Sequence, residues 1–368
     1  MKAGKKKARA AAANFVLCFF LLFLFLYDPA ASSEQLYRSL GLCAKAIVPS
    51  LFPFMVISEI FVRSGTVRFL SPILEGTSRK LFGISGTGGA AALLGAVCGF
   101  PIGAKVAGTL YESELITSDE AERIVGFGSL PSAPFVIFAI GENLFGSMRI
   151  GLFIYASVVA SAIVCGAAFA RGRRKTPAMQ KRIALPANMP PTVDIFTESV
   201  ASAASAVIKI CAYVSFFGAA VGGLSSIIAR LSPVLRAAVF SFLELSGAAA
   251  ACSSLKDDRL GIVIAAAAAG WSGLSVLCQI RSVTRTARGV ISMKPYILMK
   301  AFSALFCALS AVVCVSVFPS FLPGLPHAEE TLSPVLAYPE AFANAVNLFF
   351  IASYLIYLSK KLDTGRKI

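Results

Sequence analysis

The sequence predicts an all-α polytopic membrane protein with about eight transmembrane helices and two re-entrant hairpins, arranged as two inverted repeats. Three observations carry this prediction. Of the 368 residues, 57% are apolar and only 14% are charged, whereas a soluble domain carries about 25% charged residues. The apolar residues fall in blocks of roughly 17 to 30 residues, which as helices would span a hydrocarbon core of ~30 Å. The lysines and arginines lie mainly in the gaps between these blocks.

Eight apolar blocks are predicted to cross the membrane, and two are predicted to enter it and return. The crossing blocks are 10–27, 40–62, 124–142, 150–170, 198–229, 260–280, 296–319 and 340–359, and the hairpins are 84–110 and 237–253. A complete crossing by 84–110 would place the basic run 171–182 outside while the basic N-terminal tail lay inside, against the positive-inside rule. Re-entrant hairpins remove this conflict, and glycine, serine and proline suit broken backbone that protein covers. We therefore expect a multi-pass protein of a bacterial inner (cytoplasmic) membrane with both termini inside.

The order of the blocks divides the chain into five parts. They are a basic tail and first membrane helix (1–39), a first repeat (40–170), a cytoplasmic basic linker (171–197), a second repeat (198–319), and an outer loop, last membrane helix and basic tail (320–368). Both repeats run helix, hairpin, helix, helix, and the charge distribution gives them opposite orientations. Inverted repeats with broken helices near the middle of the membrane are the architecture of many secondary transporters.

The first apolar block admits two interpretations. Basic residues up to Arg9 precede an apolar stretch from Asn14 to Tyr27, as in a signal peptide. With the alanines from Ala10 to Ala13 the block is long enough to cross, and no clean A-x-A cleavage site follows it. An uncleaved first helix is favoured.

The net charge of +15 does not indicate nucleic acid, because the basic residues occupy short gaps rather than lining one folded face. We interpret them as topology signals, with membrane lipids as partners. The nine cysteines lie nearly all within apolar blocks and form no CxxC pair, so they are expected to pack in the interior. His327, in the predicted outer loop, is expected to be exposed and without a role.

The first candidate binding segment is GFPIGAK at 99–105. Pro101 removes a backbone donor, and Gly99 and Gly103 let the chain turn sharply, so carbonyls and amides are left free to bind a solute together with Lys105. The alternative is close helix packing through Gly95, Gly99 and Gly103. The segment is not a phosphate-binding P-loop, because GxxxxGK[ST] is absent.

The second candidate segment is 126–135, in which two prolines and two serines interrupt a span. Unwinding there would expose backbone groups beside Gly128, Ser129 and Ser132, whereas the alternative is a simple proline kink.

The counterparts in the second half are LELSG at 243–247 and GWSGLS at 270–275. Glu244 lies in an apolar hairpin, where an ionisable group is costly and usually functional. It could bind a solute hydroxyl or amine or a coupling cation, or it could serve only as a structural partner. The other candidate binding residues of this half are Ser246, Gly247, Gly270, Ser272, Gly273, Ser275 and Gln279.

Three further features have structural explanations. Lys45 and Lys209 occupy comparable places in the two repeats and are expected to reach an interface. Glu59 is expected to pair with Arg63, four residues later, at an interface rather than bind a ligand. Thr117 and Glu120 have the spacing of a capping box, which predicts a helix start in a solvated turn.

No enzyme constellation is present in the sequence. There is no HExxH, nucleophile elbow, CxxC or dinucleotide fingerprint, and the chain has a single histidine. We therefore expect no catalytic residue, no metal site and no cofactor.

Several segments together resemble the YlbJ-type sporulation integral membrane proteins, which carry a nucleoside-recognition or Gate domain. They are PSLFPF at 49–54, GFPIGAK at 99–105, GSLPSAPFVIF at 128–138, LELSG at 243–247 and GWSGLSVLCQI at 270–280. The resemblance spans roughly residues 36–315. It implies an inner-membrane protein needed in spore formation, particularly for the cortex, and distantly related to concentrative nucleoside transporters. It also implies that the hairpins and adjoining unwound helices form a solute and ion site.

The sequence thus favours a secondary transporter that holds a small polar solute, with or without a coupling cation, between the two hairpins. The alternative is a non-transporting membrane scaffold for sporulation, with the basic loops 171–182 and 281–294 as docking sites. A channel is a third interpretation, and a homo-oligomer is compatible with all three.

Overall fold

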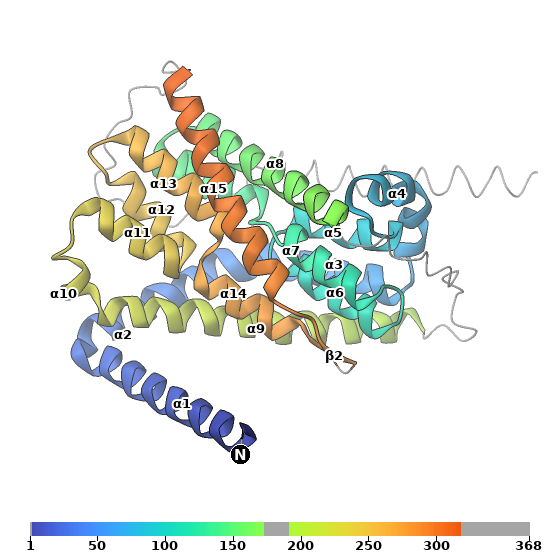
Figure 1. Cartoon of the computed structure of the whole chain (residues 1–368), viewed down its shortest axis with the longest axis horizontal. Coiled ribbons are helices and arrows are strands. Elements are labelled where there is room, and N and C mark those ends of the chain that lie inside the picture. The colour runs from blue at the N-terminus through green and yellow to red at the C-terminus, as the bar shows by residue number, and fades with distance from the viewer. Residues whose placement is uncertain (1, 173–190, 287, 318–368) are drawn as a thin grey trace, which may run out of the picture.

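The computed structural model describes residues 2–172, 191–286 and 288–317, and nearly all of them are helical (Figure 1). In chain order the elements are α1 (Lys2–Tyr27), α2 (Pro29–Leu42), the π-helix η1 (Cys43–Ile47), α3 (Val48–Arg63), α4 (Val67–Phe82), α5 (Gly86–Cys98), α6 (Ile102–Glu112), α7 (Ser118–Gly128), the π-helix η2 (Phe135–Leu144), α8 (Met148–Gly172), α9 (Thr192–Gly223), α10 (Ser225–Ile228), α11 (Pro233–Leu243), α12 (Leu245–Ser253), α13 (Asp258–Trp271), α14 (Gly273–Val283), β1 (Arg285–Thr286), β2 (Gly289–Val290) and α15 (Lys294–Val317). The two short strands pair antiparallel.

Four helical segments of the described chain are long and apolar enough to cross a membrane. They are Met148–Arg171, Thr192–Gly223, Asp258–Val283 and Lys294–Val317. Two bent pairs, α1 with α2 (94°) and α4 with α5 (86°), would raise the number to six if each is one span. The class of all-α polytopic membrane protein is confirmed, whereas the eight crossings and the inverted repeats stay predictions. The predicted block 340–359, the outer loop with His327 and most of the basic run 171–182 lie outside the described residues.

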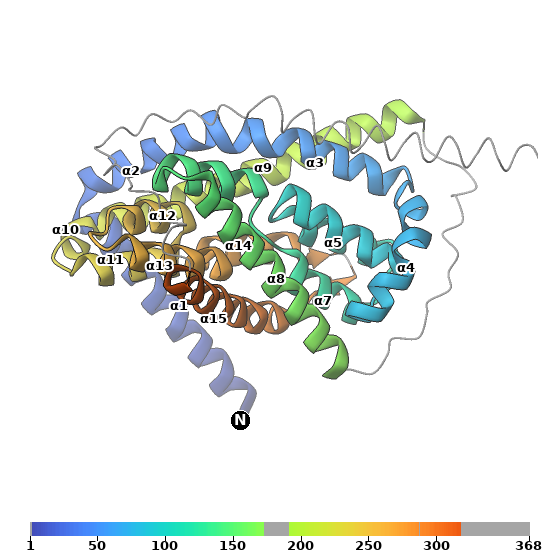
Figure 2. The same ribbon diagram turned by 90° about the horizontal axis from the view of Figure 1, so that it is seen from above.

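Large apolar side chains cover the outer faces of the long helices. Phe19 on α1, Ile208 on α9 and Leu309 on α15 are 58%, 68% and 56% exposed. Contiguous apolar surface of this extent is typical of helices that face lipid. Figure 2 places α3 and α9 on one side of the bundle and α15 on the other.

Both predicted hairpins coincide with two short helices that pack against each other, α5 with α6 and α11 with α12. The second hairpin begins earlier than expected, because Ser232 caps α11 by accepting a hydrogen bond from the Leu235 amide (3.4 Å) and Pro233 occupies the first turn. Their re-entrant course in a membrane remains a prediction.

The cysteine prediction is confirmed: all nine cysteines are free, and all but Cys18 are buried or half-buried. One cluster of buried apolar residues runs through the described helices of both predicted repeats. It includes many alanines, which let helices approach closely.

The predicted capping box at the start of α7 is confirmed. The Thr117 hydroxyl accepts a hydrogen bond from the Glu120 amide (3.2 Å), and the Glu120 carboxylate accepts one from the Thr117 amide (3.1 Å). The turn that precedes α7 is exposed at Glu112, Ser113 and Glu114, as expected. Glu120 itself is 5% exposed, and its other oxygen accepts a hydrogen bond from the Ser85 amide (2.6 Å) at the start of α5. One carboxylate therefore positions two helix starts.

Replacing Glu120 by alanine is expected to lower the free energy of unfolding by about 1–3 kcal/mol, because two backbone amides lose their acceptor. The thermal unfolding midpoint of the purified protein measures this loss. Glu142→Ala, at an exposed position, is the control; equal midpoints for the two variants would contradict the assigned role.

Candidate functional site: two pairs of helix breaks

The helical hairpin α5–α6 turns at the GFPIGAK segment. Gly99 has φ +82°, a value that favours glycine, and the Phe100–Pro101 peptide is cis. Helix α6 then begins at Ile102. The chain turns here as predicted, and the glycines also pack closely; binding by this segment stays a prediction. A Cβ on Gly95 would lie 2.8 Å from the Cα of Gly103.

The second predicted break, after Gly128, is unwound. Residues 129–132 are not helical and separate α7 from η2, so the proline-kink interpretation is wrong. The amide of Phe100 donates a hydrogen bond to the carbonyl of Leu130 (2.6 Å) across the two breaks. A Cβ on Gly99 would come within 2.7 Å of the Ser132 backbone nitrogen. The two predicted binding segments of the first half therefore contact each other through their backbones.

The breaks of the second half meet in a similar way. Between α11 and α12, Glu244 is extended, and its half-buried carboxylate accepts a hydrogen bond from the Gly247 amide (2.8 Å). A Cβ on Gly273 would lie 3.1 Å from the carbonyl oxygen of Leu243. The Trp271 indole donates a hydrogen bond to the Phe242 carbonyl (3.2 Å). The structural-partner interpretation of Glu244 thus holds for one of its oxygens, since it caps α12.

Ser272 forms the joint between α13 and α14 and has φ +72°, the left-handed conformation that a non-glycine residue rarely adopts. Gly273 follows at φ +86°. One turn and two turns further on, the side chains of Ser275 and Gln279 are buried and share a hydrogen bond of 3.3 Å. Gly270, before the joint, packs against the backbone of Ser303 on α15.

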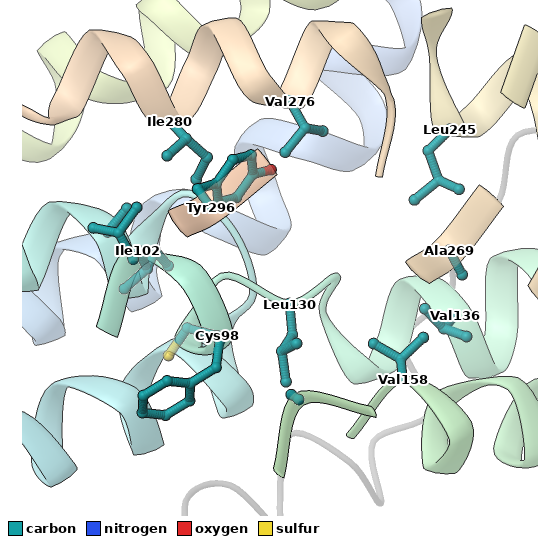
Figure 3. Packing of buried hydrophobic residues seen from close by; sticks show 14 of the residues in the cluster. Cys98, Ile102, Leu130, Val136, Val158, Leu245, Ala269, Val276, Ile280 and Tyr296 are labelled. Carbon is teal, nitrogen blue, oxygen red and sulfur yellow. The ribbon is translucent and has the colours of Figure 1, made fainter. Parts of the chain in front are cut away.

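Apolar residues from both pairs of breaks belong to one cluster (Figure 3). Cys98, Ile102 and Leu130 flank the first pair, and Leu245, Ala269 and Val276 flank the second. The structure therefore places most predicted site residues in two pairs of helix breaks. The two breaks of each pair contact each other, and the apolar cluster runs from one pair to the other.

The predicted site residue Lys105 lies in the first turn of α6, just after the first break, and its side chain contacts α3 and α9. Lys105, 14% exposed, forms an ion pair of 3.0 Å with Glu59 on α3 and donates a hydrogen bond to the Ser202 carbonyl on α9 (3.1 Å). Lys45 lies in η1, and Lys209 is exposed on α9. Ser246 lies in the first turn of α12.

The predicted pair between Glu59 and Arg63 is confirmed at 3.1 Å, and Glu59 is 3% exposed. Its place at a membrane interface stays a prediction. Glu59 lies between Arg63 and Lys105, and Arg63 also pairs with Glu198 on α9 (2.6 Å). The resulting charge cluster, Glu59, Arg63, Lys105 and Glu198, joins three helices. The signal that could have revealed it was the position of Glu59 within an apolar block, where a charge is costly unless paired.

Sequence analysis missed a second buried cation, Lys300 on α15. It is 3% exposed and donates a hydrogen bond to the Ser272 hydroxyl (3.2 Å) at the second joint. The signal was present, because Lys300 interrupts an apolar block as the only charged residue between 296 and 319.

Two hydroxyls near the breaks are buried without a hydrogen-bond partner among the described residues, those of Ser129 and Tyr296. Ser129 is the first unwound residue after α7, and Tyr296 lies one helical turn before Lys300. Buried hydroxyls are nearly always hydrogen-bonded, so these two are available to bond with water or a polar solute. Figure 3 shows Tyr296 among Ile280, Val276 and Ile102.

These features define the chain as an integral membrane protein in which helices break in contacting pairs. One curated relative matches in sequence: the sporulation integral membrane protein YlbJ of Bacillus subtilis (strain 168), which is 32% identical over 138 residues, or 37% of this chain. The match spans 34% of the length of that relative. The chain is thus a distant homologue of a sporulation membrane protein. No family model matches the chain, and no solved structure matches it.

Proposed function

We propose that this protein is a sporulation-associated secondary transporter of a small polar solute, which binds where the two pairs of helix breaks approach each other. The observation that carries the proposal is the presence of buried, unpartnered hydroxyls at Ser129 and Tyr296 beside broken helices. The name of the distant relative supports the link to sporulation.

Broken helices suit this task because their ends present backbone groups that a continuous helix would satisfy internally. After Gly128 the unwound residues 129–132 leave carbonyls and amides outside any helix. At the second pair, the Glu244 carboxylate uses one oxygen to cap α12 and keeps the other as an acceptor. The two pairs together offer donors and acceptors to an uncharged or charged polar solute without any cofactor.

Alternating access would follow from movement of one repeat against the other, with the backbone contacts inside each pair retained. Contacts within a pair are tight, as between Phe100 and Leu130. The residues that flank the two pairs, such as Leu130 and Ala269, are apolar and belong to one buried cluster. Apolar surfaces slide at lower cost than hydrogen-bonded ones, so each pair is expected to move as a unit.

The scaffold alternative rests on the basic loops. One of them, 281–294, is held against the protein, because Arg288 donates a hydrogen bond to the Tyr111 carbonyl (2.8 Å) and lies near Glu114 (3.7 Å). This argues for a structural role of that loop, and a transporter remains the better proposal.

Transport is tested with the full chain in proteoliposomes and a panel of radiolabelled nucleosides, amino acids, sugars and small organic acids. One class is expected to accumulate in a protein-dependent manner.

Glu244→Gln is expected to reduce uptake at least tenfold at unchanged abundance, because the remaining acceptor loses its charge, whereas Glu142→Gln at an exposed site should not. Normal uptake by Glu244→Gln would remove Glu244 from the site. Absence of uptake for every class, with spore formation lost on neutralising Arg285 and Arg288, would favour the scaffold.

A further inference from the structure

Lys300 is a buried amine whose surroundings hold no counter-charge. Its side chain is 3% exposed and donates a hydrogen bond to the Ser272 hydroxyl at 3.2 Å. The Tyr296 ring lies below the ammonium position at 5.8 Å, near the limit of a cation–π contact. No carboxylate pairs with Lys300 in the part of the chain that the structure describes.

The helices packed against α15 are α13, α8 and α7. Among the described residues, none of their charged side chains forms an ion pair with Lys300, including the four of α7, Asp119, Glu120, Glu122 and Arg123. The first turn of α13 holds Asp258, about 20 Å along the helix from Ser272. On α7, Arg123 and Asp119 pair with each other. The charged residues at the ends of α8, Arg149 and Arg171, are about 24 Å and about 9 Å along the helix from Cys165, which contacts α15 here, and both are cations that supply no counter-charge.

The titratable groups close to Lys300 are thiols and a phenol. They are Cys165 on α8, Cys307 on α15 and Tyr296 on α15. Near the second joint lies the carboxylate of Glu244, which caps α12 with one oxygen and forms no ion pair with Lys300 among the described residues. A charged lysine here would therefore lack the partner that buried ammonium groups require.

Hydrogen-bond accounting leads to the same result. The Ser272 hydroxyl donates its proton to the Ala269 carbonyl (3.3 Å), so its oxygen accepts from Lys300. An ammonium has three donors and an uncharged amine has two, and Ser272 accepts only one. The uncharged form leaves fewer donors unsatisfied and avoids the cost of a buried charge.

Lys300 contacts Ser272, the residue in left-handed conformation that joins α13 and α14. Ser272 has φ +72°, and the preceding residue, Trp271, stacks on Phe242 at 5.8 Å. A change in charge on Lys300 therefore acts directly on a joint that also contacts the α11–α12 break.

We propose that Lys300 is a proton-binding residue: it is an uncharged amine in the arrangement seen here, and its protonation opens the joint between α13 and α14 toward water. The proton comes from water and adds to the lone pair of Nζ, and it returns to water when the joint closes. This inference rests on the proposed transport function and adds to it that the coupling ion is a proton.

The single tryptophan of the chain, Trp271, reports the joint without a label. The full chain is placed in lipid nanodiscs, and the Trp271 emission maximum is followed from about pH 10 to about pH 5, the range that spans exposed and buried lysines. The wild-type emission is expected to shift to longer wavelength as the pH falls, because protonation exposes the indole. An emission maximum that stays constant in the wild-type protein would overturn the proposal without any variant.

Two substitutions of Lys300 should hold the Trp271 emission maximum constant across the pH range, one at short and one at long wavelength. Lys300→Met cannot be charged and is expected to keep the short-wavelength emission throughout, whereas Lys300→Arg is always charged and should keep the long-wavelength emission. Lys209→Met, at an exposed lysine on α9, is the matched control and should titrate as the wild type does. Glu244→Gln and Cys307→Ala are expected to retain the transition, which separates Lys300 from its titratable neighbours.

A wild-type transition in Lys300→Met would show that another group binds the proton. If that variant does not fold, Ser272→Ala provides the second test. Loss of the hydroxyl that accepts a hydrogen bond from Lys300 should move the pH midpoint of the emission transition. An unmoved midpoint would count against the proposal. Failure of the inference is distinct from failure of the proposed function. If a solute is taken up but Lys300 causes no pH-dependent emission transition, the proton site alone is rejected. If the emission transition occurs but no solute is taken up, transport alone is rejected.

Discussion

Replacement of Gly95 by valine is expected to prevent accumulation of folded protein in the membrane. A Cβ at this position would lie 2.1 Å from the carbonyl oxygen of Gly128 and 2.8 Å from the Cα of Gly103. Both atoms belong to backbone, which cannot move aside as a flexible side chain can. Overpacking commonly costs about 1–3 kcal/mol, and we expect the upper end of that range or more here. Membrane abundance and the thermal unfolding midpoint measure the effect.

Gly41→Val is the matched control, because a Cβ on this helical glycine of α2 would meet nothing within 4 Å. It should be close to neutral, apart from the lower helix propensity of valine relative to alanine. If Gly95→Val were as stable as Gly41→Val, the first pair of breaks would not be packed backbone to backbone.

Glu59→Gln is expected to destabilise the protein by about 3–5 kcal/mol, because Lys105 would remain in the interior without its carboxylate. Glu59 is 3% exposed and its carboxylate contacts both Lys105 (3.0 Å) and Arg63 (3.1 Å). The double variant Glu59→Gln with Lys105→Met should recover part of the loss, since it removes the uncompensated charge. Unfolding midpoints of the single and double variants give the coupling between the two side chains.

The pair of Glu34 and Arg38 provides the control for this comparison. It has the same i,i+4 spacing as Glu59 and Arg63, but its side chains are 65% and 62% exposed. Glu34→Gln should leave the midpoint unchanged, because exposed pairs contribute little. A loss as large as that of Glu59→Gln would mean that burial is not the reason for the effect.

The broken helices could be predicted from local chemistry. The close spacing of Gly99 and Pro101 strongly disfavours a continuous helix, so a turn at GFPIGAK is expected from the residues alone. The unwound segment at 129–132 and the capping box at Thr117 were predicted for the same reason. Ser272 was predicted only as a site residue, and its left-handed conformation has no sequence signature, because serine rarely adopts it.

By itself, the sequence determined that this chain is a helical membrane protein and where its helices break, because hydrophobic block length and local backbone preferences depend on neighbours in the chain. Only the tertiary structure decided the partners of its buried charges. Glu59 was predicted to pair with Arg63 but not with Lys105, which is 46 residues away, and Lys300 was not recognised as the contact of Ser272. Such pairings depend on which helices pack together, and the energy of a buried charge depends on that packing rather than on sequence distance.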